Sequence, residues 1–234
     1  MSGGATSSRR AVVLLSGGLD SLIAAHLAAH AYDLRLAITC DYGQRAAAAE
    51  IEAAATQAAR LNIPQQVVNL AWLGQISPAA LTTPDAQMPH PQAAELNDQA
   101  VTAETAQQVW VPNRNAVLVM VAAAYAEALQ AEAIVAGFNA EEALTFPDNS
   151  AEFVAAAGKL LEYSAANHPT VVSPTLEMTK TEMVQLASER GIRLDALHSC
   201  YEAGPRHCWQ CESCLRLRRA LTEAGCWEAL RPLL

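Results

Sequence analysis

The sequence predicts an α/β protein built on an open parallel sheet, with helices on both faces. Two observations lead to this expectation: short apolar, β-branched runs alternate with helical patterns, and most of the links between them are short. A third observation is a group of four cysteines near the C-terminal end, which predicts a small metal-binding segment. The 234 residues suffice for one sizeable core. We therefore expect one domain over residues 1–234, with the metal-binding appendage at about 197–220.

The composition of the chain argues against a membrane-spanning, a secreted or a nucleic-acid-binding protein. Hydrophobic residues make up 52% of the chain, but alanine supplies much of this share, and the net charge is −9. No apolar run approaches the roughly 20 residues of a membrane span, and residues 1–10 form a polar lead without the apolar centre of a secretory signal. We expect a cytoplasmic protein that binds neither a membrane nor, because it is acidic, a nucleic acid.

The first half of the chain contains three expected strands. They share a short, apolar and β-branched composition and lie at residues 11–15, 34–39 and 65–70. A helical pattern follows the first strand, and an alanine-rich helix at 46–61 follows the second. Residues 74–108 are polar and interrupted by prolines, so we expect an irregular insertion there, either a passive surface loop or a functional, mobile segment.

The second half continues the alternation of helix and strand. The expected helices are at 117–129, 152–167, 179–190 and from about 212 onward, and the expected strands are at 133–137 and 171–174. The helix at 179–190 has the clearest boundaries. It begins with a Thr-Lys-Thr-Glu capping box at Thr179 and ends before Gly191, the residue type that most often terminates a helix.

The segment 16–21 reads Ser-Gly-Gly-Leu-Asp-Ser and lies between the first strand and its helix. Backbone N–H groups of such a turn, together with the helix dipole, attract an anion, and two glycines allow a phosphate to approach closely. Asp20 is compatible with a phosphate only if a cation such as Mg²⁺ bridges them. The segment lacks the Gly-Lys-Ser/Thr of a Walker A loop and the third glycine of a dinucleotide site. The simplest alternative is a tight turn without a ligand.

The four clustered cysteines have the spacing Cys-x7-Cys-x2-Cys-x2-Cys. Two-residue spacers let successive sulfurs face one ion, and four thiolates suit a structural Zn²⁺ with no open position. We expect the ligands Cys200, Cys208, Cys211 and Cys214. An iron–sulfur or redox role is the rival interpretation, and His198 and His207 are competing ligands. Cys40 and Cys226 stand apart and are expected to be small core residues.

Four motifs occur in order along the chain. They are the loop at 16–21, Asp-Tyr-Gly-Gln-Arg at 41–45, Val-Pro-Asn-Arg-Asn at 111–115, and the cysteine pattern followed by Leu215-Arg216. The loop is similar to the SGGxDS loop of the ATP pyrophosphatases. Together the motifs resemble the 7-cyano-7-deazaguanine synthase (QueC) family along essentially the whole chain. This resemblance implies a Rossmann-like sheet of the adenine nucleotide α-hydrolase type.

The resemblance also implies a reaction. ATP would adenylate the carboxylate of 7-carboxy-7-deazaguanine and release pyrophosphate, and ammonia would displace AMP to give an amide. A second ATP would activate the amide oxygen, and loss of AMP would leave 7-cyano-7-deazaguanine, a precursor of queuosine. The implied cofactors are ATP, Mg²⁺ and one structural Zn²⁺. No glutaminase domain is evident, so free ammonium is the simpler nitrogen source.

Candidate site residues come from the positions that match the family. The nucleotide-binding positions are Ser16, Gly17, Gly18, Leu19, Asp20, Ser21, Gln44 and Arg45. The catalytic positions are Asp20, Ser21, Arg114 and Lys180, and the substrate-binding positions are Tyr42, Asn113, Asn139, Glu142 and Asp148. The scarce cations Arg45, Arg114 and Lys180 are expected to gather at the ATP edge. Several of the candidate residues also have a plainer, structural alternative. Lys180 would be a solvated lysine on a helix, and Arg114 would form an ion pair that caps a helix. Asn139, Glu142 and Asp148, which are the candidates for recognising the base, would instead cap loops. Glu50 is expected to be a surface or ion-pair residue.

One segment departs from the family. Many members have Ser-Gly-Tyr-Pro-Asp-Cys-Arg where this chain has Leu-Thr-Phe-Pro-Asp-Asn-Ser at 144–150, so only Pro147 and Asp148 match. A second hypothesis is therefore a QueC-like ligase that joins a deazaguanine carboxylate to another amine, such as that of a protein, without forming a nitrile.

Two further functions are alternatives. tRNA thiolation would need a catalytic cysteine, for which Cys40 is the candidate, and a basic face. A zinc-stapled binding module is the non-enzymatic alternative. The helix at 117–129 offers a face for the core or for a homodimer.

Overall fold

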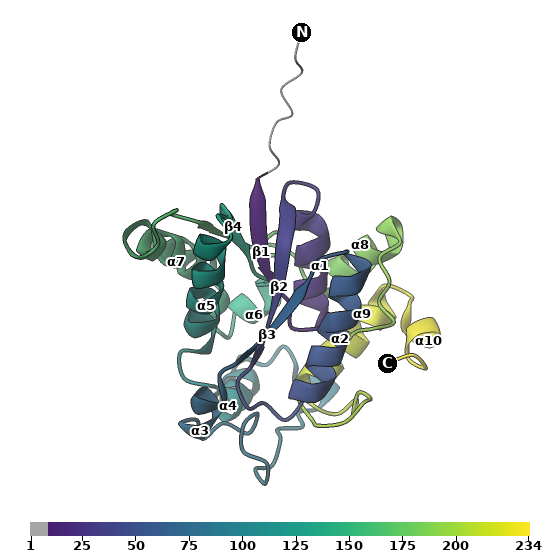
Figure 1. The fold of residues 1–234 in the computed structure, drawn as a ribbon. Coiled ribbons are helices and arrows are strands. Elements are labelled where there is room, and N and C mark those ends of the chain that lie inside the picture. The colour runs from purple at the N-terminus through teal and green to yellow at the C-terminus, as the bar shows by residue number, and fades with distance from the viewer. Residues whose placement is uncertain (1–8) are drawn as a thin grey trace.

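The computed structural model describes residues 9–234, and a five-stranded parallel sheet lies at its centre (Figure 1). The strands are β1 (Arg10–Leu14), β2 (Asp33–Asp41), β3 (Gln65–Asn69), β4 (Ala133–Val135) and β5 (Thr170–Val172). Their order is β3-β2-β1-β4-β5, and every neighbouring pair is parallel. The expected α/β class with an open parallel sheet is confirmed. Most of the expected polar lead, residues 1–8, lies outside the described part.

Helices cover both faces of the sheet. The main ones are α1 (Leu19–Ala28), α2 (Ala47–Arg60), α5 (Arg114–Ala128), α7 (Ala151–Ser164), α8 (Lys180–Arg190) and α9 (Glu212–Glu223). Figure 1 shows α5 and α7 on one side of the sheet and the other four on the opposite side. Successive side chains of a strand point to opposite faces. Val13 therefore packs with the alanines of α1 and α2, whereas Val12 packs with Val119 and Ala122 of α5.

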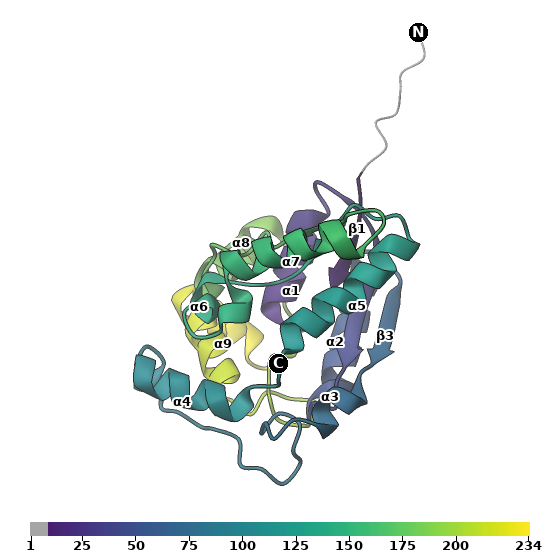
Figure 2. The same ribbon diagram turned by 90° about the vertical axis from the view of Figure 1, so that its left-hand side faces the viewer.

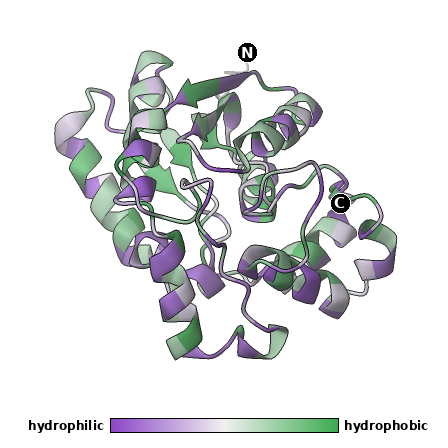
Figure 3. Ribbon diagram, turned by 90° about the horizontal axis from the view of Figure 1, so that it is seen from below, coloured by the Kyte–Doolittle hydropathy of each residue, from purple (hydrophilic) through white to green (hydrophobic). Residues whose placement is uncertain are grey.

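The sheet has a topological switch point between β1 and β4. From β1 the chain moves outward to β2 and β3, and it later returns to build β4 and β5 on the other side. In open α/β sheets a ligand crevice forms at this point, outside the carboxyl ends of the strands. Figure 3 looks onto that edge and shows apolar strands at the centre, surrounded by helices with mixed hydropathy.

The insertion at 74–108 is more ordered than expected. It follows α3 (Ala71–Gln75) and contains the 3₁₀ turn η1 (Ala93–Glu95) and most of the helix α4 (Gln99–Val109). The Asp98 side chain caps α4 by accepting hydrogen bonds from Ala100 N at 2.9 Å and Val101 N at 3.4 Å. The buried face of α4 carries the small or polar residues Thr102, Thr105 and Ala106, which hide the helical period from a hydrophobicity pattern. Figure 2 shows α4 beneath α9, away from the sheet.

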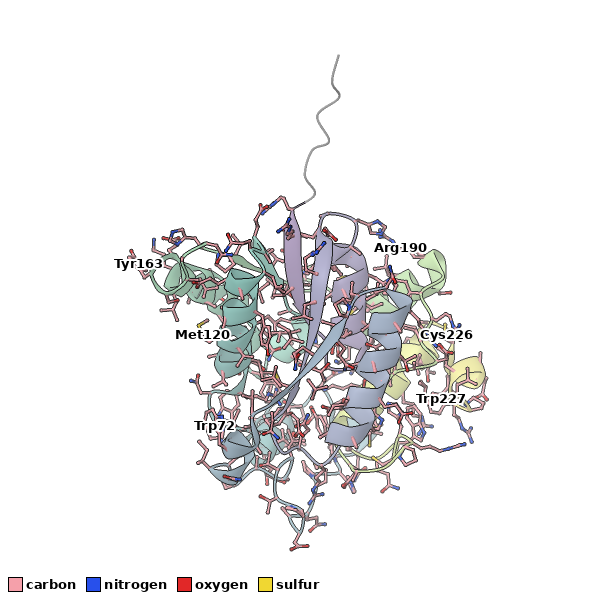
Figure 4. The ribbon with its side chains drawn as sticks, in the orientation of Figure 1. Trp72, Met120, Tyr163, Arg190, Cys226 and Trp227 are labelled. Carbon is pink, nitrogen blue, oxygen red and sulfur yellow. The ribbon has the colours of Figure 1, made fainter. Side chains whose placement is uncertain are left out.

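Besides α3 and η1, three further short elements were not expected: α6 (Ala140–Ala143), η2 (Pro147–Asn149) and α10 (Trp227–Leu230). The capping box at Thr179 is confirmed, and Gly191 ends α8 in the left-handed conformation at φ +66°. Cys226, labelled beside Trp227 in Figure 4, is half-buried against the α8–α9 core. None of the described helices has the length and apolar character needed to cross a membrane.

Candidate functional site

The glycine-rich loop joins β1 to α1 at the switch point, where close packing allows only glycine at two positions. A Cβ atom on Gly17 (φ +85°) would lie 2.7 Å from the backbone oxygen of Glu50, and one on Gly137 would lie 2.5 Å from Ser21 N. Ser21 is buried, and its Oγ lies 3.1 Å from Ser16 Oγ. The Leu19 side chain packs in the core, so only its backbone is available to an anion. The loop thus leads into the first turn of α1, and backbone N–H groups at such a helix start can bind an anion.

Lys180, the first residue of α8, lies between two acidic side chains. Its Nζ is 2.7 Å from Asp20 Oδ2 and 2.9 Å from Glu142 Oε1. Burial opposes the charge of Lys180, but the two carboxylates outweigh it and raise the pKa of Lys180. Lys180 in turn outweighs the burial of Glu142 and lowers the pKa of that carboxyl. Lys180 is 5% exposed, so it is not the solvated helix lysine of the plainer expectation.

Asp20 keeps one oxygen free. Burial raises the pKa of Asp20 to about 6, although Lys180 acts in the opposite direction. Among the residues that the structure describes, Asp20 Oδ1 is buried and has no hydrogen-bond partner. A buried carboxylate oxygen beside a glycine-rich loop at a helix start fits a cation such as Mg²⁺, which prefers oxygen ligands.

A cavity of about 210 Å³, called the main cavity below, opens next to this loop, at the ends of β1, β2 and β4. Its polar lining comes from the loop, from the segments that follow β2 and β4, from the start of α5 and from the cysteine region. These residues are Ser16, Asp20, Ser21, Tyr42, Gln44, Glu50, Arg114, Asn115, Glu142, Asn149 and Tyr201. The structure therefore brings together three of the six expected loop residues (Ser16, Asp20 and Ser21) with Tyr42, Gln44, Arg114 and Glu142.

Arg114 faces the cavity across the ring of Tyr42. Its guanidinium carbon is 5.6 Å from the ring centroid, and Nη1 donates a hydrogen bond to Tyr42 Oη at 3.3 Å. Among the described residues Arg114 forms no ion pair within 4 Å, so the expected plainer role as a capping salt bridge is wrong. Asn113 precedes it with φ 55° and is exposed outside the cavity lining, which corrects the expected contact with substrate.

Glu50 is neither a surface residue nor part of an ion pair within the described chain, which corrects the expectation. It lines the cavity, and its Oε2 accepts a hydrogen bond from Gln44 Nε2 at 2.8 Å. Burial raises the pKa of Glu50 to about 7. Gln44 also donates to Cys40 O at 3.1 Å and accepts from Tyr42 N at 2.9 Å, so its amide is held from both sides.

Arg45 turns away from the cavity, which corrects its expected position at the ATP edge. Its guanidinium donates to the carbonyl oxygens of Thr83, Pro84 and Ala86, and Nη1 lies 3.0 Å from Glu202 Oε2. Arg45 therefore fastens the insertion to the cysteine region. Its neighbour in sequence, Gln44, lines the cavity. Both residues lie in the turn that precedes α2, which begins at Ala47, and their side chains point in different directions.

Two expected base-recognition residues lie outside the main cavity. Asn139 is fully buried and caps α6, accepting from Glu142 N at 2.9 Å. Asp148 borders a smaller space of about 30 Å³, beside the stacked rings of Trp110 and Phe146. Asn149, which replaces the family's cysteine, is buried and lines the main cavity, and Ser150, which replaces the arginine, caps α7. Asn139 thus shapes the loop, as its plainer expectation held.

Tyr201 was missed by the sequence reasoning, although it follows Cys200 directly. It lines both cavities, together with Leu81, Arg114 and Glu142. Its position next to a metal ligand was the available signal, because a ligand loop fixed by a metal also fixes its neighbours. Cys40 is a buried core residue, as expected, and also borders the main cavity. Burial raises the pKa of the Cys40 thiol to about 11, which leaves it protonated at neutral pH and unsuited to sulfur transfer.

The four clustered cysteines fit a metal ion. Their sulfur atoms all lie within 4.8 Å of one another, and none forms a disulfide. Backbone N–H groups point at the sulfurs, for example Cys211 N at 3.2 Å from Cys208 Sγ, which suits thiolate ligands. His207 uses both ring nitrogens, accepting from Ser199 N and contacting Leu234 O, each at 3.0 Å. The donor set is thus four sulfurs, the tetrahedral arrangement that Zn²⁺ accepts.

A parallel sheet of this order, with an SGGxDS loop at its switch point, defines a PP-loop protein. A family model described as "Queuosine biosynthesis protein QueC" matches residues 10–225, and the chain belongs to the QueC family. It is 46% identical to the 7-cyano-7-deazaguanine synthase of Bdellovibrio bacteriovorus over 218 residues, covering 93% of this chain and 94% of the relative. It is 47% identical to that of Desulforudis audaxviator over 216 residues, with coverages of 92% and 98%. The resemblance drawn from the four motifs is confirmed.

One solved structure is similar in fold. The U34-tRNA thiolase NcsA from Methanococcus maripaludis, with its [4Fe-4S] cluster, matches with a TM-score of 0.52 and 14% identity. The match covers 97% of this chain and 73% of that protein. At this identity the likeness supports the shared PP-loop fold alone.

Proposed function

We propose that this chain is a 7-cyano-7-deazaguanine synthase, which converts 7-carboxy-7-deazaguanine and ammonia to the nitrile at the expense of ATP. Family membership and the names of the similar proteins support the activity. The observation that carries the proposal is the meeting of the glycine-rich loop, the Asp20–Lys180–Glu142 group and Arg114 beside one cavity. The loop that would bind phosphate and the guanidinium of Arg114 therefore lie close enough to contact the same bound substrate.

Activation of the carboxylate is the first chemical requirement, because its leaving group would otherwise be oxide. In the proposed step a carboxylate oxygen attacks the α-phosphorus of ATP, and pyrophosphate leaves. Ammonia then adds to the acyl carbon, AMP departs with the former carboxylate oxygen, and a proton is released, giving the amide. The amide oxygen then attacks the α-phosphorus of a second ATP and pyrophosphate leaves again, and loss of AMP together with the two protons of the amide nitrogen gives the nitrile.

The residues divide this work by position. Loop N–H groups and Ser16 hold the phosphates, and Lys180 retains one donor of its three after pairing with Asp20 and Glu142. Arg114, with its guanidinium facing the cavity, orients the carboxylate of the substrate. Asp20 Oδ1 would hold Mg²⁺, which when bound neutralises phosphate charge. Holding both reactants in line supplies much of the rate.

The four cysteines would hold a structural Zn²⁺, since four protein ligands leave no open position for chemistry. Their role in the proposal is to fix the loop that carries Tyr201 into the cavity wall. Free ammonium as nitrogen donor, a homodimeric assembly and a cytoplasmic location remain expectations drawn from the sequence.

The direct test incubates the purified protein with Mg-ATP, 7-carboxy-7-deazaguanine and ammonium. We expect AMP and pyrophosphate, with the amide appearing transiently and the nitrile accumulating by mass spectrometry. Accumulation of amide alone, or of a conjugate with another amine, would contradict nitrile synthesis and support the ligase hypothesis. Absence of AMP would contradict the adenylation chemistry and favour a binding module.

A further inference from the structure

Three acidic side chains line the main cavity, and one of them, Glu50, forms no salt bridge with a described residue, although the charge of Arg114 acts on it. Asp20 and Glu142 both pair with Lys180, at 2.7 Å and 2.9 Å. Glu50 forms no salt bridge with any residue that the structure describes, and its one hydrogen bond there comes from the neutral Gln44 amide. Glu50 is half-buried, and a carboxyl group that lines a cavity without a salt bridge can accept hydrogen bonds from a ligand that binds there.

Gln44 fixes the direction of this carboxyl group. Its Nε2 is shared between Cys40 O and Glu50 Oε2, and its Oε1 accepts from Tyr42 N, so the amide has little freedom to rotate. Gln44 is thus a positioning residue that engages one oxygen of Glu50. The other oxygen, Oε1, remains available to the cavity that Glu50 lines.

The walls around Glu50 suit a flat heteroaromatic ring. Tyr42, Ile38 and Leu81 line the same cavity and are buried against the core. We propose that Glu50 is the residue that recognises the guanine-like edge of the substrate, accepting hydrogen bonds from its ring N–H and its exocyclic amine. This assignment rests on the proposed function, because it takes 7-carboxy-7-deazaguanine as the ligand.

Donor–acceptor chemistry separates the two ring systems that enter this site. The guanine-like edge presents two adjacent donors, which match the acceptors of a carboxylate. The corresponding edge of the adenine of ATP presents one donor and one acceptor, which repels a carboxylate. A glutamine at position 50 offers one acceptor and one donor. The substitution Glu50→Gln therefore mismatches the guanine-like edge and is tolerated by adenine.

The test compares Glu50→Gln with Glu52→Gln, a matched change on the exposed face of the same helix. Dissociation constants for 7-carboxy-7-deazaguanine and for a non-hydrolysable ATP analogue are measured by calorimetry on each full-length protein. We expect Glu50→Gln to weaken binding of the deazaguanine by about 10- to 150-fold, the range for a hydrogen bond to a charged group. Its ATP analogue affinity, and both affinities of Glu52→Gln, should stay within about twofold of wild type.

A second ligand separates recognition from a structural effect. An analogue of 7-carboxy-7-deazaguanine without the exocyclic amine should bind wild type more weakly than the parent, but bind Glu50→Gln about as well as the parent does. The assignment of Glu50 would be overturned if removing the exocyclic amine weakened binding equally in wild type and in Glu50→Gln. It would also be overturned if Glu50→Gln lost affinity for the ATP analogue. If wild type binds the ATP analogue but not 7-carboxy-7-deazaguanine and forms no nitrile, the proposed function itself fails and this assignment with it.

Discussion

At the scale of single residues, the pairing of Lys180 with two carboxylates determines what each substitution does. Asp20 gives one oxygen to Lys180 and keeps the other free at the phosphate loop, whereas Glu142 remains paired if Asp20 is removed. The charge of Lys180 therefore stays compensated without Asp20. This arrangement separates a loss of chemistry from a loss of folding.

Replacing Asp20 by alanine tests that separation. We expect pyrophosphate release to fall by at least about 10²–10³-fold, the usual cost of losing one electrostatic contact in a transition state. The circular dichroism spectrum should stay close to that of wild type, because Lys180 keeps Glu142. A variant with wild-type rates of pyrophosphate release would refute the role of Asp20 at the phosphates.

The titration of Glu50 predicts a pH effect on stability. Burial raises the pKa of the folded carboxyl to about 7 from its ordinary value of 4.5, so between these pH values the folded state binds more protons than the unfolded state. The contribution of Glu50 to stability is thus fully present below pH 4.5 and declines as the pH rises through 7. Glu50→Gln should melt increasingly above wild type as the pH is raised from 5 to 8. A melting difference that does not change with pH would contradict this account.

At the scale of elements, arginines hold the insertion onto the rest of the chain. Arg45 binds the carbonyls of residues 83–86, while Arg216 donates to Leu96 O at 3.2 Å and Arg219 to Asn97 Oδ1 at 2.9 Å. On α4, Thr105 donates to the buried Glu212 of α9 at 2.7 Å. The insertion and the cysteine region therefore form one connected wall of the site.

Arg45→Met should loosen that wall without removing a nucleotide contact. We expect faster hydrogen exchange of amides near residues 83–86 and 202, since three carbonyls and Glu202 lose their contacts with Arg45. Affinity for a non-hydrolysable ATP analogue should change by less than about twofold. A large loss of ATP affinity with unchanged exchange would restore the original expectation that Arg45 binds the nucleotide.

Metal removal should act on the same wall. Chelation leaves four thiolates without their shared ligand, so residues 198–214 should exchange amide hydrogen faster and the melting temperature should fall, by about 2–4 °C for each kcal/mol lost. Tyr201 should become more accessible, which nitration by tetranitromethane can report when the modified peptides are identified by mass spectrometry. Unchanged exchange and melting after complete metal loss would contradict a structural role.

The features that are determined by residues close together in the sequence were predicted correctly. The alternating strands, the loop at 16–21, the capping box at Thr179 and the cysteine spacing all follow from neighbouring residues, and the structure reproduces them. The helix α4 was missed because three of its four buried residues are two threonines and an alanine. Glu50 and Arg45 were misjudged because burial on α2 and the partners of a long guanidinium depend on segments distant in the sequence.

At the scale of the whole molecule, a net charge of −9 leaves few cations for anionic ligands. Arg114 borders the cavity and Lys180 lies beside the phosphate loop, whereas Arg45, Arg216 and Arg219 hold the surrounding segments in place. The switch point between β1 and β4 brings these groups to one edge of the sheet. The fold therefore places two of its 15 lysines and arginines, Arg114 and Lys180, beside the cavity, where the carboxyl groups of Asp20, Glu50 and Glu142 also lie.

Transfer of oxygen from the carboxylate to AMP tests this account most directly. The protein is supplied with 7-carboxy-7-deazaguanine carrying ¹⁸O at both carboxylate oxygens, together with Mg-ATP and ammonium, and the products are analysed by mass spectrometry. The account predicts two AMP molecules for each nitrile, each carrying one ¹⁸O atom, and unlabelled pyrophosphate. Label in phosphate or pyrophosphate, or nitrile formed with unlabelled AMP, would contradict adenylation of the substrate at this site.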